Sequence, residues 1–321
     1  MNNVSFLTPV QEQLQLVEAR LHAQADDRHP DLRAALEQIL SAGGKRIRPT
    51  LGLLVGNMLG APEDKLITLG AAVELLHTAT LVHDDLIDGS LLRRGTPTLN
   101  ARWSPAATVL TGDFLFARAA KLAAETDHLP LMNAFAETLA TIVNGELNQM
   151  FTSRGVINRE NYYQRIYAKT ASLFEMTASA AAMISPAGDS ALETMRKLGY
   201  ETGIAFQIVD DVLDFTGEQA TVGKPIGSDL LNGLVTLPAI YYAEAHPDDE
   251  DVKSLSDGGW ANHERMTRLV ASIRHTDSVR KAMTDAQQHV DRALKTLERF
   301  DPSPEREALE NLAKFIVDRN V

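Results

Sequence analysis

The chain has 321 residues, of which 44% are hydrophobic, and a formal net charge of −12. This length and composition supply a substantial buried core, which excludes a wholly disordered protein. The acidic balance argues against nucleic-acid binding, because phosphate backbones recruit basic surfaces, and the lack of cysteine excludes disulfides, thiolate zinc sites and cysteine nucleophiles.

The amino-terminal segment, residues 1–21, has neither the basic start nor the apolar core of a signal peptide. No later stretch approaches the ~20 uninterrupted apolar residues of a membrane span. We therefore expect a soluble protein and place it in the cytoplasm. The acidic composition also argues against electrostatic attachment to anionic lipid.

Long segments rich in Ala, Leu, Glu and Met are separated by sparse prolines, and one of them, residues 131–185, contains none. Apolar residues recur three and four apart within these segments, for example at Leu14, Val17 and Leu21. Clear strand alternation is missing. The pattern predicts an all-α bundle, which we treat as one domain over residues 1–321, with connectors at residues 41–49, 89–100, 152–161, 216–233 and 246–260.

An aspartate cluster, HDDLIDGSLLRRG, ends one of the apolar helical runs and contains Asp84, Asp85 and Asp88. Residues four apart share a helix face, so Asp84 and Asp88 point the same way and suit one hard cation. His77 lies two turns earlier on nearly the same face. A lone histidine on an apolar helix is more often a satisfied core residue, but the shared face favours a diphosphate contact.

A second cluster, FQIVDDVLDF, repeats the spacing with Asp210, Asp211 and Asp214. Neighbouring carboxylates repel each other and gain nothing from burial unless cations lie between them. Magnesium usually binds through a few carboxylates plus substrate phosphates, which suits a bridging diphosphate. A single cluster is as easily a solvated helix terminus; two copies, each near basic residues, favour the metal site.

The basic residues come in separate groups near the two clusters. Gly43 and Gly44 permit a backbone turn in GGKRIRP, and Pro49 is suited to open the next helix. Arginine grips phosphate oxygens with a planar fork and lysine acts as a point charge, so together the groups suit two diphosphates. Singly, each cation is more simply a surface charge. The groups are Lys45, Arg46 and Arg48; Arg93 and Arg94; Lys169 beside Thr170; and Lys224.

These residues resemble the trans-polyprenyl diphosphate synthase family, in particular its medium- and long-chain, octaprenyl-type members. The resemblance runs from about Gly43 to Tyr241 and rests on GGKRIRP, ELLHTATLVHDDLIDGSLLRRG, the pair Gly112 and Asp113, KTASLF, FQIVDDVLD and GKPIGSDL. It implies one large helical bundle around a central cavity, as in isoprenoid synthases. It also implies a magnesium-dependent homodimeric prenyltransferase that joins isopentenyl diphosphate to an allylic diphosphate.

The resemblance further implies roles for individual residues. Magnesium, at about three ions per active site, is assigned mainly to Asp84, Asp88 and Asp210, with assistance, direct or through water, from Asp85, Asp211 and Asp214. Isopentenyl diphosphate is assigned to Lys45, Arg48, His77 and Arg94. The allylic diphosphate is assigned to Arg93, Lys169, Thr170, Gln207 and Lys224. The candidate catalytic residues are Asp84, Asp88, Asp210, Lys169 and Lys224.

Leu234 departs from the family pattern, because members often have a lysine at this position in NGLVTLP. One phosphate contact is then absent, and affinity for the allylic diphosphate is expected to be lower. Asparagine is also common there in long-chain members.

Product length should depend on where a bulky side chain blocks the tunnel, because an isoprene unit is about as long as one helical turn, roughly 5.4 Å. Short-chain members tend to carry an aromatic ring four or five positions before the first motif, and here those positions are Thr80 and Ala79. No aromatic side chain therefore blocks the tunnel at the helical turn nearest the motif, and Leu76 lies one turn deeper. We expect a hexaprenyl to decaprenyl product, with geranylgeranyl or farnesyl diphosphate as the shorter alternative. Ala79 is equally suited to close helix packing.

Two rival functions remain open. A class I terpene cyclase also ionises a diphosphate, but it would have one aspartate motif and would leave GGKRIRP without a role. A regulatory subunit of a heteromeric synthase would be expected to have lost aspartates, and both motifs are complete; Leu234 alone favours it. Because the product is a lipid, we also expect at most transient membrane contact when it is released.

Overall fold

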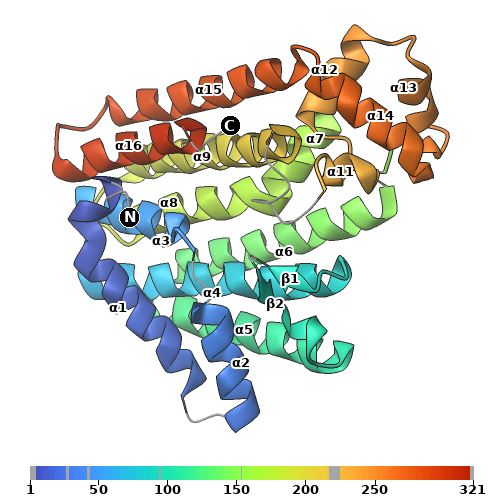
Figure 1. The fold of residues 1–321 in the computed structure, drawn as a ribbon. Helices are drawn as coiled ribbons and strands as arrows, with labels where there is room; N and C mark the ends of the chain where they lie inside the picture. Colours follow the sequence, from blue (N-terminus) through green and yellow to red (C-terminus); the bar gives the residue numbers. More distant parts are fainter. Residues whose placement is uncertain are drawn as a thin grey trace. The chain divides into compact units, whose positions relative to one another are not determined.

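The structure is a computed structural model that describes residues 5–26, 29–41, 44–93, 95–152, 154–216 and 225–318. Helices dominate it, which confirms the predicted all-α class, and strands occur only in one short hairpin of the described chain (Figure 1). The chain divides into two compact units, each assembled from separate stretches of sequence. The single domain over residues 1–321 stays a prediction.

The first unit takes in Met1–Glu137, Met176–Arg196 and Phe300–Leu312. Within it α4 packs against α1, α3 and α5. Its elements in chain order are η1 (Ser5–Val10), α1 (Gln11–His22), η2 (Ala23–Ala25), α2 (Pro30–Ser41), α3 (Ile47–Met58), α4 (Glu63–Ile87), β1 (Leu92–Arg93), β2 (Thr96–Pro97), η3 (Leu99–Ala101) and α5 (Pro105–Glu125).

The second unit takes in Thr138–Glu175, Lys197–Arg299 and Ala313–Val321. Helices α6 (Leu129–Thr152), α8 (Ser172–Met183), α9 (Asp189–Thr216) and α16 (Pro304–Asp318) have residues in both units. The remaining elements belong to the second unit alone: α7 (Arg159–Ile166), the π-helix η4 (Tyr167–Ala171), α11 (Ser228–Leu231), α12 (Leu237–Ala245), α13 (Glu250–Leu255), η5 (Gly259–Ala261), α14 (His263–Arg274) and α15 (Ser278–Leu297).

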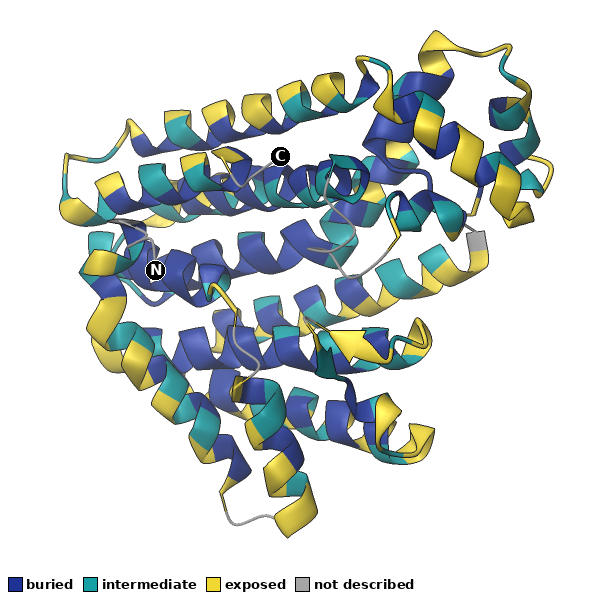
Figure 2. Cartoon of the chain, in the orientation of Figure 1, coloured by how far each residue is buried: buried dark blue, intermediate teal, exposed yellow. Residues whose placement is uncertain are grey.

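Helix α4 is the central helix of the first unit and is buried over most of its length (Figure 2). It is long and apolar enough to cross a membrane by length and composition, but 72% of its most apolar window is buried in the fold. A buried core helix passes the same test. Its apolar character is therefore explained by packing.

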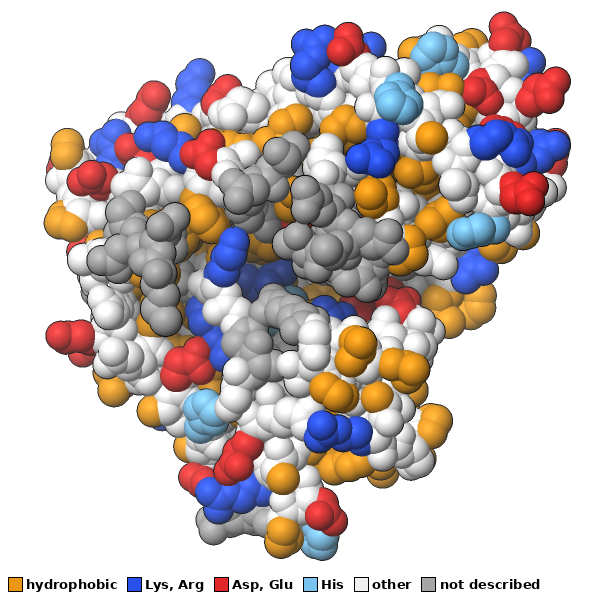
Figure 3. Space-filling model, viewed as in Figure 1, with side chains coloured by type: hydrophobic (Ala, Val, Ile, Leu, Met, Phe, Trp, Pro, Cys, Tyr) orange, Lys and Arg blue, Asp and Glu red, His pale blue; other side chains and the backbone are white. Residues whose placement is uncertain are grey.

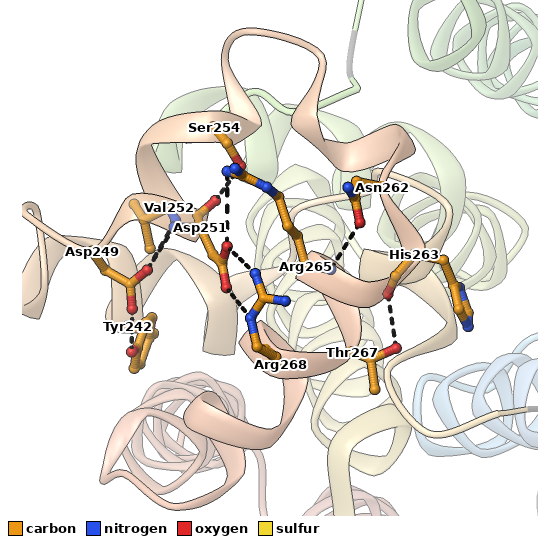
Figure 4. Close-up of polar contacts among 10 residues, drawn as sticks. All are labelled: Tyr242, Asp249, Asp251, Val252, Ser254, Asn262, His263, Arg265, Thr267 and Arg268. Atoms are coloured by element: carbon orange, nitrogen blue, oxygen red, sulfur yellow. Dashed lines mark hydrogen bonds and ion pairs between the residues drawn. The ribbon is translucent and has the colours of Figure 1, made fainter.

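Three connectors contain more structure than predicted; the one at residues 216–233 holds α11. The connector at residues 89–100 holds the β1–β2 hairpin, where Arg93 pairs with Thr96 and Gly95 takes a positive φ of 76°. The connector at residues 246–260 contains α13, which begins because the Asp249 side chain accepts hydrogen bonds from the backbone N–H groups of Asp251 and Val252 (Figure 4). These elements are too short to produce a periodic apolar pattern.

Candidate active site

One face of α4 carries the first aspartate motif. Asp84 and His77 are half-buried and Asp88 is exposed, whereas the neighbouring Ala79 and Asp85 are buried. Positions 77, 80, 84 and 88 fall within one helical stripe, and each of these residues is half-buried or exposed. The predicted grouping of His77, Asp84 and Asp88 on one face therefore holds in the helix, which ends at Ile87 with Asp88 as its C-cap.

Asp85, the second residue of that motif, points into the first unit instead. Arg93 Nε lies 3.0 Å from each of its carboxylate oxygens, and Arg93 Nη2 lies 2.9 Å from Oδ1. Arg93 lies on β1, the strand that follows α4 along the chain. Arg94 lies outside the described residues. In this structure Asp85 is an anchor for Arg93, and its assisting role toward magnesium stays a prediction.

The basic segment before α3 separates into outward and inward side chains. Lys45 is exposed and Arg48 is half-buried. Arg46 takes a left-handed backbone conformation at the N-cap of α3 and turns inward, where Nη1 lies 2.7 Å from Glu74 Oε1 and the guanidinium also binds Glu18. Arg46 is thus paired with two carboxylates inside the fold, and the assignment of Lys45 and Arg48 to the diphosphate stays a prediction.

The pair Gly112 and Asp113 on α5 accommodates His83. A Cβ atom added at Gly112 would lie 2.1 Å from His83 Nε2, so only glycine leaves room for the imidazole. His83 Nε2 lies 3.1 Å from the Val109 carbonyl oxygen and 3.6 Å from Asp113 Oδ1. This motif is explained by the contact between α4 and α5, where His83 packs against Gly112.

The second aspartate motif occupies a comparable face of α9. Asp210 and Asp214 are half-buried, as are Phe206 and Gln207 one turn earlier, while Asp211 is 3% exposed. Asp84 belongs to the first unit and Asp210 to the second. In both motifs the first aspartate is accessible and the second is buried.

Asp211 is held by two protein donors. Tyr162 donates its hydroxyl to Oδ2 at 2.6 Å, and Gln207 Nε2 donates to Oδ1 at 2.9 Å. Burial and the charge of Asp229 raise the pKa of Asp211 to about 7, against the opposing effect of these hydrogen bonds. Burial and the neighbouring Asp211 likewise raise the pKa of Tyr162, which keeps the phenol a donor.

Asp214 fixes the chain beyond the second motif. Its Oδ1 accepts hydrogen bonds from the Ser228 amide at 3.1 Å and the Ser228 hydroxyl at 2.8 Å, and its Oδ2 accepts from the Asp229 amide at 3.2 Å. These donors come from α11, within the GKPIGSDL segment. Lys224, which precedes them, lies outside the described residues.

Lys169 and Thr170 lie in the π-helix η4, a wide helical turn that is frequent at functional sites. Lys169 Nζ lies 2.7 Å from Glu146 Oε1 on α6, and Thr170 donates its hydroxyl to Gln207 Oε1 at 2.6 Å. Two of the predicted allylic diphosphate contacts, Thr170 and Gln207, are therefore brought together.

Comparison with known proteins decides the family. The family model for polyprenyl synthetase matches residues 29–273. Over 319 residues the chain is 35% identical to an all-trans-nonaprenyl-diphosphate synthase (geranyl-diphosphate specific) of Rhodobacter capsulatus, with 98% of this chain and 97% of the relative covered. The chain belongs to the polyprenyl synthetase family.

Other members of the family are similar over the same length. Component 2 of the heptaprenyl diphosphate synthase of Geobacillus stearothermophilus is 34% identical over 319 residues, covering 98% of each chain. A crystal structure of the polyprenyl synthase from Caulobacter crescentus, complexed with calcium and isoprenyl diphosphate, superposes with a TM-score of 0.91 at 32% identity and covers 99% of this chain and 98% of that one. The predicted resemblance and the prenyltransferase class are confirmed.

Some residues of this polyprenyl synthetase were missed by the sequence reasoning. Tyr162 and Glu146 contact predicted site residues, and Asp229 raises the pKa of Asp211. Asp229 lies within the quoted GKPIGSDL segment, so its position after the second motif was an available signal. Tyr162 lies 49 residues before its partner Asp211, and no local pattern connects the two.

Proposed function

We propose that the chain is a trans-prenyltransferase that condenses isopentenyl diphosphate with an allylic diphosphate and releases a linear polyprenyl diphosphate of hexaprenyl to decaprenyl length. One observation carries the proposal: a polyprenyl synthetase matched over almost its whole length retains both aspartate motifs, each with its first aspartate on a partly exposed helix face. The nonaprenyl and heptaprenyl names of the relatives support the length range.

Magnesium is the proposed cofactor, at about three ions per active site. Within the described residues no group of three or more His, Asp or Glu side chains is arranged to hold a metal by itself. Magnesium fits this donor set, because it commonly takes one or two carboxylates and completes its shell with water and substrate phosphates. Asp84, Asp88 and Asp210 would hold it, and when bound it supplies Lewis-acid neutralisation of the departing diphosphate. The calcium in the Caulobacter structure is likewise a hard divalent cation.

The cations of the chain orient the two substrates. Isopentenyl diphosphate is proposed to bind Lys45, Arg48, His77 and Arg94. The allylic diphosphate is proposed to bind Arg93, Lys169, Thr170, Gln207 and Lys224. Holding both reactants in one geometry lowers the entropic part of the barrier. Lys169 and Lys224 place point charges where the leaving diphosphate develops negative charge.

A second copy of the chain is the proposed partner. The exposed side of α6 carries large apolar residues at the i, i+4, i+7 spacing of a helix seam, at Val143, Leu147 and Met150, with Phe151 alongside. Contiguous exposed apolar rows of this kind commonly mark protein interfaces. We propose a homodimer in the cytoplasm, with at most transient membrane contact during product release.

Two other readings are outcomes of the same experiment. The Geobacillus relative is one component of its synthase, so a chain that works only with a partner is the second candidate. The third is a shorter geranylgeranyl or farnesyl product. No nucleic-acid partner is proposed, and on the face shown in Figure 3 the Lys and Arg side chains are interspersed with Asp and Glu.

The test is to incubate the purified chain with isopentenyl diphosphate, farnesyl diphosphate and magnesium, and to size the lipid products. Linear prenyl diphosphates of hexaprenyl to decaprenyl length, the range that includes the heptaprenyl and nonaprenyl products named for the relatives, support the proposal. Cyclic hydrocarbons would indicate a terpene cyclase. Absence of turnover without an added second chain would indicate the heteromeric alternative.

A further inference from the structure

A chain of three hydrogen bonds connects α7 and η4 to α9 in the second unit. Thr170 donates to Gln207 Oε1 at 2.6 Å, Gln207 Nε2 donates to Asp211 Oδ1 at 2.9 Å, and Tyr162 donates to Asp211 Oδ2 at 2.6 Å. Both oxygens of the Asp211 carboxylate therefore accept from protein donors. The proposed function uses Thr170 and Gln207 for substrate and gives Tyr162 no role.

Two glycines bring α9 close enough for this hydrogen-bond chain to form. A Cβ atom added at Gly203 would lie 2.6 Å from the Cα atom of Ala171, and one added at Gly199 would lie 2.5 Å from the Phe174 carbonyl oxygen. No real side chain tolerates such contacts with backbone. Positions 199, 203, 207 and 211 are spaced by four and lie along one side of α9. The glycines permit this close approach, and the hydrogen bonds act together with the buried apolar side chains of α9 in fixing its rotation.

The rotation of α9 determines where Asp210 points. Consecutive helical residues are about 100° apart around the axis, so a buried, doubly bound Asp211 leaves Asp210 on the accessible face. Tyr162 is 1% exposed and comes from a different helix, α7. Its hydroxyl is thus a fixed point outside α9 against which the motif is oriented.

We infer that Tyr162 is a positioning residue of the second aspartate motif, acting through Asp211 on the metal-binding geometry of Asp210. The inference rests on the proposed function, because it assumes that Asp210 binds a divalent cation. Replacing the hydroxyl removes one of the two donors that hold the buried Asp211 carboxylate. The carboxylate is then less firmly oriented, which disturbs the geometry of the neighbouring ligand Asp210.

The direct test is cation binding to Tyr162→Phe, measured without turnover. Mn2+ serves as the probe for magnesium, and its binding to the protein is titrated by electron paramagnetic resonance in the presence of inorganic pyrophosphate. Losing a group that orients a metal ligand typically weakens metal affinity about 10–100-fold. We expect a loss in this range, a matching rise in the magnesium concentration for half-maximal activity, and an unchanged KM for isopentenyl diphosphate.

Tyr242→Phe is the matched control. Tyr242 also donates its hydroxyl to a carboxylate, Asp249 Oδ2 at 2.8 Å, in the same unit, and Asp249 caps α13 (Figure 4). The chemical change is identical, but no predicted site residue takes part. Mn2+ affinity and the magnesium requirement of this variant should equal those of the unchanged chain.

Asp211→Asn provides a second variant if Tyr162→Phe fails to fold. The asparagine side chain has the same shape as aspartate, and its amide oxygen can still accept the hydrogen bond from Tyr162. Its Nδ2 group, however, faces Gln207 Nε2, which is also a donor, so the second hydrogen bond is lost. The same weakening of Mn2+ binding is expected, and combining it with Tyr162→Phe should add little, because both act at one point.

The outcomes separate the two proposals. If the unchanged chain is active and its Tyr162→Phe variant binds Mn2+ with undiminished affinity, the positioning role alone is overturned. Where Tyr162→Phe does not fold, undiminished Mn2+ affinity in Asp211→Asn overturns that role. An unchanged chain that neither binds Mn2+ with pyrophosphate nor turns over substrate overturns both proposals. Weakened Mn2+ binding in Tyr162→Phe, with the Tyr242→Phe control unaffected, supports the inference.

Discussion

Arg93 Nε lies 3.0 Å from both carboxylate oxygens of Asp85, and this fork joins the hairpin β1–β2 to the end of α4. The Asp85 side chain is 11% exposed and that of Arg93 is 41% exposed. The pair therefore holds Arg93, which is predicted to contact the allylic diphosphate, beside the first aspartate motif. Tyr162 holds Asp211 of the second motif in a similar way.

Removing the arginine should cost stability as well as affinity. In Arg93→Ala the Asp85 carboxylate keeps its burial and loses its charged partner, which costs about 2 kcal/mol in free energy of unfolding. Urea unfolding measures this loss, and steady-state kinetics should show a higher KM for the allylic diphosphate. Arg280→Ala is the control, because Arg280 is 73% exposed and pairs with the exposed Asp277, so its loss should leave the free energy of unfolding nearly unchanged. Equal stability of the two variants would contradict the anchoring role.

Product length should respond to Thr80. This side chain is half-buried on the stripe of α4 that carries Asp84, four residues away. A phenylalanine there projects from the accessible face one turn before the motif. We expect Thr80→Phe to shorten the product to farnesyl or geranylgeranyl diphosphate, as read by chromatography of the dephosphorylated lipids. An unchanged product length would show that the growing chain does not pass Thr80.

Ala79 should behave differently from Thr80, although the two positions were equal candidates on sequence grounds. Ala79 is 0% exposed and points away from the accessible stripe of α4. Ala79→Phe overpacks the core and should cost about 1–3 kcal/mol in stability, seen as a lower midpoint of thermal unfolding. A stable Ala79→Phe variant with a shortened product would contradict this assignment.

A lysine introduced at Leu234 should strengthen substrate binding. The Leu234 backbone is fixed by a bridge to Arg154 and by donation of its N–H to the Asp229 carbonyl oxygen at 2.8 Å, and its side chain is only half-buried. Leu234→Lys would supply the phosphate contact that the family resemblance leads us to expect at this position, worth about 1.5 kcal/mol. The KM for the allylic diphosphate should fall by about tenfold, while Leu234→Met leaves it unchanged. An unaltered KM in the lysine variant would show that this position lies away from the diphosphate.

The proposed homodimer should depend on the α6 seam. Leu147→Glu places a charge among the exposed apolar residues Val143, Met150 and Phe151, and burying an unpaired charge is costly. Sedimentation equilibrium should show a monomer for this variant and a dimer for the unchanged chain. Asn133→Glu, at an exposed polar position nearer the start of the same helix, should remain dimeric. A dimeric Leu147→Glu variant would place the interface elsewhere.

The fold class and the motifs were readable from sequence because they are local. Helical spacing alone placed His77, Asp84 and Asp88 on one stripe, and the same spacing recurs at Asp210 and Asp214. Boundaries were less predictable. The hairpin at Leu92–Pro97 and helix α13 are set by one glycine turn and one capping aspartate, which leave no periodic signal.

The partners of the site residues were not readable, since they lie far apart along the chain. Tyr162 and Asp211 are 49 residues apart, and Lys169 meets Glu146 on another helix. The sequence also offered Arg46 on equal terms with Lys45 and Arg48. Only its left-handed backbone and its contacts with Glu18 and Glu74 show that it faces inward.

The proposed function requires both aspartate motifs to act on one metal–diphosphate cluster. The most direct measurement is a crystal structure of the chain with magnesium and a non-hydrolysable thio analogue of farnesyl diphosphate. We predict that carboxylates of Asp84 and Asp210 both coordinate ions that bridge to the same diphosphate. A diphosphate held by one motif alone, with the other aspartate remote from every ion, would contradict the account.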